Sequence, residues 1–411
     1  MRRSRYILVL FFVLQACVEE FTAETEDLED LLVVDALLTD EMRHHEVRLT
    51  RVFAFEAEGP VTESGASVAM VDDQGTRFAF VEAEAGTYRS ESAFSAQQGR
   101  SYALEVETSD GRDYRSDQVR MPAPVPIDAL RAQRVTNDRG EEGVGIYLDN
   151  NATGVRPTFF RYEFDETYKI IAPRWDPFRL RVVRYEPCFS NPFVVDIVAW
   201  EDERKTCFGT SSSNRLIQAS SVDLQGSAIE NYQLHFLSRD NYIISHRYSI
   251  NVRQYAQTQE AYSFYERLGD FSSSDNLFSQ VQPGFLEGNI VSRDDADEKV
   301  LGYFEVASVS EKRMYFNYDD LFPGEPLPPY AINCGFIGNP RLIPQGYHCA
   351  DVGVCDGNCE SPLIEAILAG IITLAGPKDG DFVSPYYTWP SPCGDCTQLG
   401  SNIIPEFWSE E

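Results

Sequence analysis

The chain has 411 residues, of which 43% are hydrophobic and 12% aromatic. This content can fill sizeable cores and excludes an intrinsically disordered chain, and the length is enough for two or three domains. The formal net charge of −30 argues against a nucleic-acid partner, because neutralising phosphates requires clustered Lys and Arg.

Residues 1–16 have the pattern of a secretory signal peptide. Three arginines among the first five residues precede an apolar run over 7–14 that is too short to span a bilayer. The run leads into LQAC (14–17), which resembles the lipobox of bacterial lipoproteins, where cleavage before the cysteine leaves that cysteine lipidated. We therefore expect Cys17 to carry a lipid anchor. The alternative is an ordinary secretory peptide with a chance cysteine.

An acidic stretch over 17–30 follows the cysteine and includes Glu19, Glu20 and the sequence TAETEDLEDL. Like charges keep a linker extended, so this stretch is predicted to be a solvated tether. Acidic residues directly after a lipidated cysteine also resemble the surface-export signal of Bacteroidetes lipoproteins. We therefore expect the protein in the outer membrane, lipid-anchored and facing the cell exterior.

Short strands and tight turns dominate residues 31–122. LLVVDALLTD begins this region, and two strand pairs follow with turns at Asp-Gln-Gly (73–75) and Asp110-Gly111. Turn signals at this spacing, with no long amphipathic helix, predict an immunoglobulin-like β-sandwich. The proline-rich sequence PAPVPIDAL (122–130) predicts an extended linker after it.

Residues 123–411 are predicted to form a larger β-rich α+β domain with a few short helices. Strand-like segments alternate aromatic and β-branched residues with charge, as in TFFRYEFDETYKII (158–171). One helix is expected in TQEAYSFYERLGDF, with Thr258 as N-cap, Gly269 as the C-terminal stop, and a buried face of Ala261, Tyr262, Phe264, Tyr265 and Leu268. A second short helix is expected in LIEAILAGIITLA (363–375), which is too short for a membrane span.

Eight cysteines remain after Cys17. An even number of cysteines in an exported protein favours disulfides over a metal site. Their pairing stays open. A zinc site that includes Cys393 and Cys396 is the weaker alternative. The disulfide candidates are Cys188, Cys207, Cys334, Cys349, Cys355, Cys359, Cys393 and Cys396.

Several segments together resemble the DUF4249 proteins of Bacteroidetes. They include LLVVDALLTD, GASVAMVDDQGTRF and the MPAPVPIDAL hinge in the first half, and YSINVRQYAQTQEAYSFYERL, GNIVSRDDADEKVLGYFEVASVSEKRMYF and CGDCTQLGSNIIPEFW in the second. The resemblance implies a lipoprotein encoded beside a TonB-dependent outer-membrane transporter, and it supplies no catalytic residue. The hydrophobic segment 363–375 is not a feature of that resemblance.

No catalytic constellation is evident, and no cofactor or metal is expected. The five histidines show no metal-ligand spacing apart from the adjacent His44 and His45, which point to opposite faces of a strand. The sequences SRDDADEKV (292–300) and GPKDGDF (376–382) resemble fragments of calcium loops, but the loop spacing and the closing glutamate are missing, which favours turns. A carboxylate pair of the glycosidase kind stays open.

Aromatic residues concentrate in the cysteine- and proline-rich end of the chain. Rings on disulfide-pinned loops suit an interaction surface, and core filling is the equal alternative. The candidates for this surface are Tyr330, Tyr386, Tyr387, Trp389 and Trp408. The sequence thus favours a non-catalytic surface lipoprotein that assists a TonB-dependent transporter in substrate capture or gating. The alternatives are a carboxylate-dependent surface hydrolase and a purely structural or adhesive protein.

Overall fold

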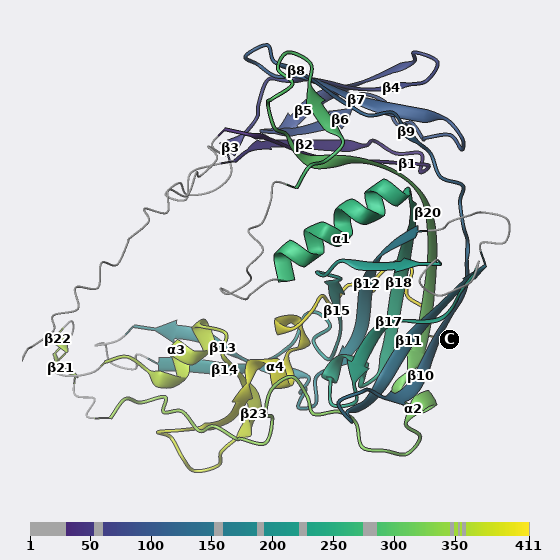
Figure 1. Cartoon of the computed structure of the whole chain (residues 1–411). Coiled ribbons are helices and arrows are strands. Elements are labelled where there is room, and N and C mark those ends of the chain that lie inside the picture. Colours follow the sequence, from purple (N-terminus) through teal and green to yellow (C-terminus); the bar gives the residue numbers. More distant parts are fainter. Residues whose placement is uncertain are drawn as a thin grey trace, which may run out of the picture.

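The computed structural model of the protein describes residues 30–52, 61–151, 159–186, 193–221, 228–273, 286–345, 349–351, 354–355 and 359–410. The signal peptide, Cys17, the tether up to residue 29, Cys188 and His348 lie outside these residues. Figure 1 shows three β-rich parts in a row, which we call the N-terminal β-unit, the central sandwich and the C-terminal module. The prediction of a mostly β fold with few short helices is confirmed.

The N-terminal β-unit is built from short antiparallel strands around one hydrophobic core. The predicted turns are present: Asp72 accepts hydrogen bonds from the amides of Gln74 and Thr76, and Gly75 and Gly111 have positive φ angles. The immunoglobulin-like topology of this unit stays a prediction. Its strands are β1 (Leu32–Thr39), β2 (Glu46–Arg51), β3 (Val61–Thr62), β4 (Ser67–Asp72), β5 (Arg77–Glu84), β6 (Thr87–Ser90), β7 (Ser101–Glu107), β8 (Asp113–Ser116) and β9 (Val119–Arg120).

Two later strands complete this unit, so a division of the chain at residue 122 does not capture it. Strand β19 (Ile290–Ser292) pairs with β8, and the first half of β20 (Leu301–Asn317) runs parallel to β1, from Val33 opposite Leu301 to Thr39 opposite Ala307. The second half of β20 pairs with a strand of the central sandwich. One continuous strand therefore joins the two parts.

The central sandwich consists of two facing sheets. Strands β15 and β16 both pair with β12, and the order then continues through β18 to β20, while β10, β11 and β17 form the opposite sheet. Its further elements are β10 (Ile127–Thr136), β11 (Glu142–Asn151), β12 (Phe159–Ile171), β15 (Thr206–Ser212), β16 (Ile217–Ser220), β17 (Ala228–Ser238), η1 (Tyr242–Ile244), β18 (Arg247–Gln257) and α2 (Tyr318–Leu321).

Along the long strands, residues of the hydrophobic core alternate with residues of the outer face of this sandwich. On β12, Phe160, Tyr162 and Phe164 lie in the core, whereas Arg161 and Glu163 face outward. The same period-two pattern holds on β18, where Tyr248 and Ile250 are core residues. The outer face is consequently rich in charge.

Helix α1 (Gln259–Ser273) covers the upper part of that outer face (Figure 1). Thr258 caps the helix as predicted, because its Oγ1 accepts a hydrogen bond from the Ala261 amide at 3.2 Å. Two predictions about this helix are wrong. The helix continues past Gly269 for another four residues, and Leu268 is 43% exposed instead of buried.

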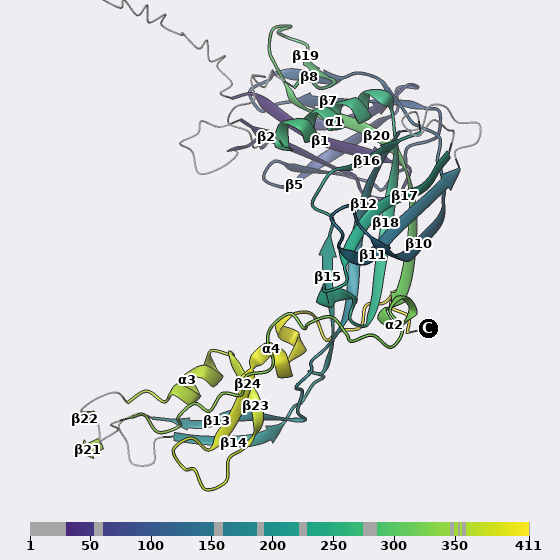
Figure 2. The ribbon, with the colours of Figure 1, turned by 60° about the horizontal axis from the view of Figure 1, so that its bottom comes forward.

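The C-terminal module comprises the described parts of residues 173–200 and 334–395, and Figure 2 shows it at the end of the molecule away from the N-terminal β-unit. The hairpin of β13 and β14 packs against α3, β23 and β24 around a small core. The elements are β13 (Phe178–Tyr185), β14 (Phe193–Ala199), β21 (Cys349–Asp351), β22 (Val354–Cys355), α3 (Pro362–Leu368), β23 (Ile372–Pro377), β24 (Tyr386–Pro390) and α4 (Ser391–Gly394), with η2 (Cys396–Gln398) following.

The hydrophobic segment 363–375 corrects a further prediction, since it is not one helix. Helix α3 ends at Leu368, Gly370 adopts a φ of 66°, and the β-branched residues Ile372 and Thr373 belong to strand β23. Leu363, Ile364 and Leu374 close the core of the module. In the described part of the chain, no helix has both the length and the apolar character needed to cross a membrane.

Acid is expected to destabilise the N-terminal β-unit through His45. This side chain has no exposed surface, and burial lowers its pKa from 6.5 to about 4 although its Nε2 lies 2.9 Å from the Phe94 carbonyl oxygen. The unfolded chain binds the proton near pH 6.5 and the folded chain only near pH 4, so this contribution to stability is complete above pH 6.5 and is lost as the pH falls. We expect it to remove about 2–3 kcal/mol of unfolding free energy between pH 7 and pH 4.5.

Urea titrations at both pH values would measure this loss, with His45→Gln as the comparison. The variant should lose less stability on acidification than the parent chain. Equal losses in the two proteins would contradict the assignment to His45.

Candidate ligand cleft

A cleft of about 690 Å³ lies where the N-terminal β-unit, helix α1 and strand β20 meet. This volume lies within the range of pockets that hold small ligands. Its lining comes from four separate stretches of sequence, namely residues 117–120, 258–267 and 287–289, together with Tyr303. The cleft therefore exists only because the fold brings these stretches together.

The first part of α1 forms one wall of the cleft, and Tyr303 contributes from β20. Ala261 and Phe264 anchor the helix, and the Phe264 ring stacks on Tyr303 with 4.8 Å between the ring centroids. Burial raises the pKa of Tyr303 to about 12, so its hydroxyl stays protonated at neutral pH. Thr258, Gln259, Glu260 and Ser263 belong to the lining.

The opposite wall, residues 287–289, is held by backbone contacts. The Asn289 side chain makes two hydrogen bonds of 2.9 Å with the backbone of Phe304, and the Asp117 amide donates to the Asn289 carbonyl oxygen at 2.8 Å. Gly288 lies so close to Gly302 that a Cβ atom on it would be 1.8 Å from the Gly302 carbonyl oxygen. A side chain at position 288 would therefore displace this wall.

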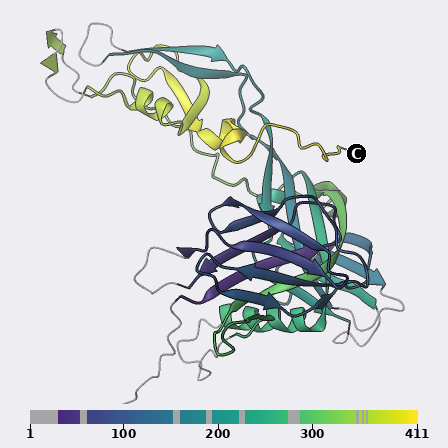
Figure 3. The ribbon, with the colours of Figure 1, turned by 90° about the horizontal axis from the view of Figure 1, so that it is seen from above.

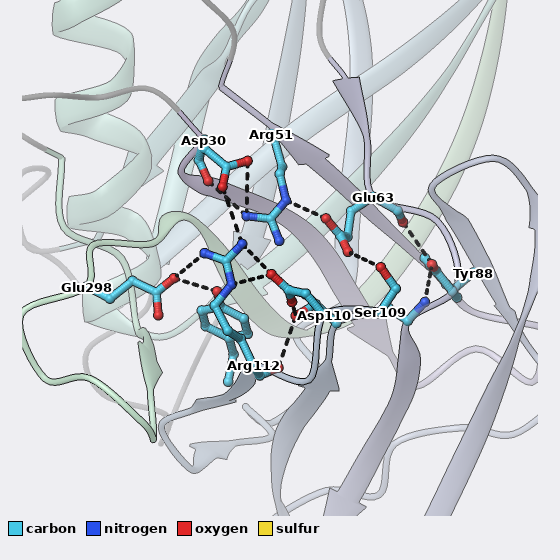
Figure 4. A network of polar contacts seen from close by, with 11 residues as sticks. Asp30, Arg51, Glu63, Tyr88, Ser109, Asp110, Arg112 and Glu298 are labelled. Carbon is cyan, nitrogen blue, oxygen red and sulfur yellow. Dashed lines mark hydrogen bonds and ion pairs between the residues drawn. The ribbon is translucent and has the colours of Figure 1, made fainter.

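An ion-pair network fixes the segment that follows this wall. Figure 4 shows Arg112 between three carboxylates, those of Asp30, Asp110 and Glu298, at 3.3, 2.7 and 3.0 Å. The Tyr114 hydroxyl also donates to Glu298 at 2.6 Å. The network ties residues 290–300 to β8 and thereby holds the wall of the cleft in place.

The same contacts account for the acidic sequence at 292–300. Asp294 accepts a hydrogen bond from the Asp113 amide at 2.8 Å, and Glu298 is bound by Arg112 and Tyr114. In GPKDGDF, Asp381 pairs with Lys378 at 2.8 Å. In both stretches, carboxylates are bound by donors of the protein itself. This agrees with the prediction of turns over that of calcium loops. Over the residues that are described, no group of three or more His, Cys, Asp and Glu side chains could hold a metal ion.

A second hollow of about 400 Å³ adjoins the cleft and shares Arg120, Thr258 and Gln259 with it. Its lining is more apolar and includes Met121, Pro122 and Phe159. Arg120 thus stands at the boundary between a polar and an apolar half. Within the described residues, the Arg120 side chain makes neither an ion pair nor a hydrogen bond, so its guanidinium is available to a ligand.

Charge of both signs lines the polar half. Asp117, Glu260 and Glu287 supply carboxylates, and Arg120 and Arg267 supply guanidinium groups. Amide and hydroxyl side chains lie between them. Such a lining suits a polar ligand with several hydrogen-bonding groups.

Two deeply buried glutamates, Glu166 on β12 and Glu305 on the half of β20 that pairs with β1, lie outside the cleft lining. Glu166 accepts hydrogen bonds from Tyr248 and Ser211 and lies 3.2 Å from His235 Nε2. Burial would raise its pKa, but these contacts together lower it, which is opposite to what a general acid requires. Glu305 is bound by Arg161 and Gln257.

Residues 18–313 match the family model described as a domain of unknown function, DUF4249. The chain belongs to the DUF4249 family. Among curated proteins none matches it.

Two solved structures are similar to the DUF4249 chain at low scores. A DUF4785 family protein from Legionella pneumophila subsp. pneumophila str. Philadelphia 1 shares 9% identity over 55% of this chain and 52% of that one, with a TM-score of 0.17. The adhesin InvE of Yersinia pseudotuberculosis shares 12% identity over 56% and 57%, with a TM-score of 0.15. The chain spans about half the length of each, and at these scores the likeness adds nothing to the fold described above.

Two disulfides lie within the described residues of this DUF4249 protein and join four of the eight candidate cysteines. Cys207 bonds to Cys396 and Cys334 bonds to Cys393, so the two cysteines of the CGDC motif have different partners. Cys359 is also disulfide-bonded. Cys349 and Cys355 are backbone partners in the register of β21 and β22.

The five aromatic candidates do not form one surface on the DUF4249 chain. Tyr330 packs against the core of the central sandwich, and Tyr386 packs against the core of the C-terminal module. Trp389 lies under the Arg174 guanidinium, 4.8 Å away, and Tyr387 is exposed. Trp408 packs against Phe208 on the central sandwich.

The cleft could not be predicted from the sequence, because no single stretch of residues has a pattern that indicates it. The predicted linker at 122–130 contributes only Pro122 and Ala123, which line the adjoining hollow, whereas Thr258, the predicted helix cap, lines both the hollow and the cleft. Their proximity depends on β19 and β20 returning to the N-terminal β-unit, which no local pattern encodes.

Proposed function

We propose that the protein is a non-catalytic binding protein that holds a polar ligand in the cleft at the junction of its first two parts. The observation that carries this proposal is the cleft itself, with its ligand-sized volume and, at the boundary of its two halves, Arg120, whose side chain makes no ion pair or hydrogen bond to the residues that the structure describes. The lipobox-like LQAC sequence supports an anchor on Cys17, placed on the outer membrane and facing the exterior. The family resemblance supports a TonB-dependent β-barrel transporter as the partner that receives the ligand.

The C-terminal module supplies a surface suited to such a partner. Eleven of the 21 large apolar side chains that are exposed in the described chain lie in this module, with Phe382 at 85% and Phe336 at 79%. Backbone pairing of Gly338 with Thr388 and of Leu342 with Val383 places residues 336–343 beside residues 383–388. An accumulation of exposed apolar side chains of this kind is typical of protein interaction sites.

The cleft is tested with Arg120→Ala. Polar compounds selected by a thermal-shift screen on the full chain should bind at least tenfold more weakly to the variant, a loss of about 1.4 kcal/mol. The unfolding free energy should change by less than about 0.5 kcal/mol, because the exposed Arg120 side chain makes neither an ion pair nor a hydrogen bond within the described part of the chain.

Arg89→Ala is the matched control, since Arg89 is an exposed arginine outside the cleft lining. Its effect on binding should be negligible. Selected compounds that bind equally well to both variants and to Gln259→Ala would refute the cleft as the site.

The anchor and the partner are tested together in a mild-detergent pulldown of the native lipoprotein, read by mass spectrometry. Lipid on Cys17 and a stoichiometric β-barrel transporter are the expected results. A lipidated protein recovered without a transporter would refute the proposed partner. The binding function would then be tested by the cleft experiment alone.

A further inference from the structure

Residues 401–410 cross the central sandwich without a helix or strand and make a turn in which the Trp408 amide donates to the Pro405 carbonyl oxygen at 2.9 Å; Figure 3 shows them as the yellow trace that ends at the label C. At its start, the backbones of Ser401 and Phe208 exchange two hydrogen bonds of 2.8 and 2.9 Å. In the middle, Ile403 and Ile404 are 74% and 65% exposed. The segment is thus attached at its two ends and makes little contact between them.

The far end of the segment occupies a site made of aromatic rings and cations. The Trp408 ring meets Phe208 and Tyr315 edge to face, with centroids 4.9 and 6.1 Å apart. The Arg313 guanidinium lies 3.6 Å from the centroid of the Phe407 ring. The Tyr315 hydroxyl donates a hydrogen bond to the Phe407 carbonyl oxygen.

A carboxylate is the last group of the segment that is bound here. Lys169 Nζ lies 2.9 and 3.0 Å from the two carboxylate oxygens of Glu410, beside a hollow of about 320 Å³ that Arg247 and His246 also line. We call the residues that hold the segment the slot: Lys169, Phe208, Arg247, Arg313 and Tyr315. Three of them are cations, in a chain whose formal charge is −30.

We infer that the slot is a recognition site for a peptide segment of a partner protein that carries two adjacent aromatic residues followed by a carboxylate, and that residues 407–410 occupy this site in the free chain. Residues 407–410 show which ligand groups the slot binds. Two aromatic rings pack against the rings and guanidinium groups of the slot, and a carboxylate pairs with Lys169. The middle of the segment is exposed and its contacts lie at its two ends, so the far end can leave the slot and be replaced. This inference does not depend on the cleft.

The test uses the full chain with Phe407→Ser and Trp408→Ser, which empties the slot, and a fluorescent peptide of residues 403–410 as the probe. The peptide should bind the emptied chain at least tenfold more tightly than the parent chain, because the tethered segment competes at high effective concentration. Adding Lys169→Glu to the emptied chain should abolish binding, as should serine at both aromatic positions of the peptide.

Ile403→Ser with Ile404→Ser is the matched control, since it alters exposed residues of the same segment and should leave the slot occupied. Binding that is absent from a folded emptied chain, or that tolerates serine in the peptide, would overturn the inference. Dimers of the parent chain that vanish when the slot is emptied would also overturn it, because a second copy would then be the occupant.

A measurement on the unaltered chain guards against misfolding of the variants. Excess peptide should speed amide hydrogen exchange in residues 402–410 without affecting β18 or β20. Exchange that stays the same with saturating peptide would contradict a replaceable segment.

Discussion

Replacing Arg161 with alanine is expected to lower the unfolding free energy by about 3–5 kcal/mol, because it leaves a charge buried without its partner. Arg161 Nη2 lies 3.1 Å from Glu305 Oε2, and the Glu305 side chain has no exposed surface. The guanidinium also stacks on Tyr255 and Tyr265, at 4.2 and 5.4 Å from their ring centroids. Tyr265 belongs to α1, so the loss should loosen the helix that lines the cleft.

Urea denaturation of the folded variant would measure the effect. Arg181→Ala is the matched control, because the Arg181–Asp196 pair is half exposed on both sides at 3.5 Å and should contribute less than about 1 kcal/mol. Replacing Arg161 and Glu305 together by methionine should restore much of the loss, since no unpaired charge remains. If Arg161→Ala lowers the unfolding free energy as little as the control does, then hydrogen bonds from Gln257 and water are sufficient for the buried Glu305 carboxylate.

The local features of this fold could be predicted because each has a short-range cause. The Asp72 turn and the Thr258 cap both depend on a side chain bonding an amide within four residues. The alternation on β12 fixes which residues face the core before any partner strand is known. These patterns identify strands and helix starts, and they leave the pairing open.

The errors within α1 and the segment 363–375 have different physical origins. Helix α1 continues through Gly269 because a glycine costs a helix only about 1 kcal/mol and need not end it. In the second case the signal was present in the sequence, since Gly370 is followed by Ile371, Ile372 and Thr373, which favour a strand. Apolar character alone does not distinguish the two structures.

The cleft and the cysteine pairing could not be derived from the sequence, because both depend on contacts between distant residues. Strand β20 reaches β1 across more than 260 residues, and Cys207 bonds to a cysteine 189 residues away. Six crowded cysteines permit many pairings, and only the fold selects Cys334 with Cys393. The charged outer face was visible as a pattern, but its occupants, α1 and residues 401–410, were not.

Removing the Cys207–Cys396 disulfide by replacing both residues with alanine is the other change expected to cost about 3–5 kcal/mol. The bond joins β15 of the central sandwich to η2, and it closes a loop of 189 residues, so its loss greatly enlarges the unfolded ensemble. Both cysteines are fully buried, which makes alanine a better replacement than serine.

The bond also holds the start of the segment that occupies the slot, because Cys396 lies five residues before Ser401, whose backbone pairs with Phe208. Loss of the bond should therefore speed amide hydrogen exchange in residues 396–410, in addition to lowering the unfolding free energy. The matched control is Cys334→Ala with Cys393→Ala, which opens a loop of only 59 residues and should cost roughly 1 kcal/mol less in the chain-entropy account. If the two pairs cost the same and exchange in residues 396–410 is unchanged, then packing around β15 and not the covalent link fixes the position of that segment.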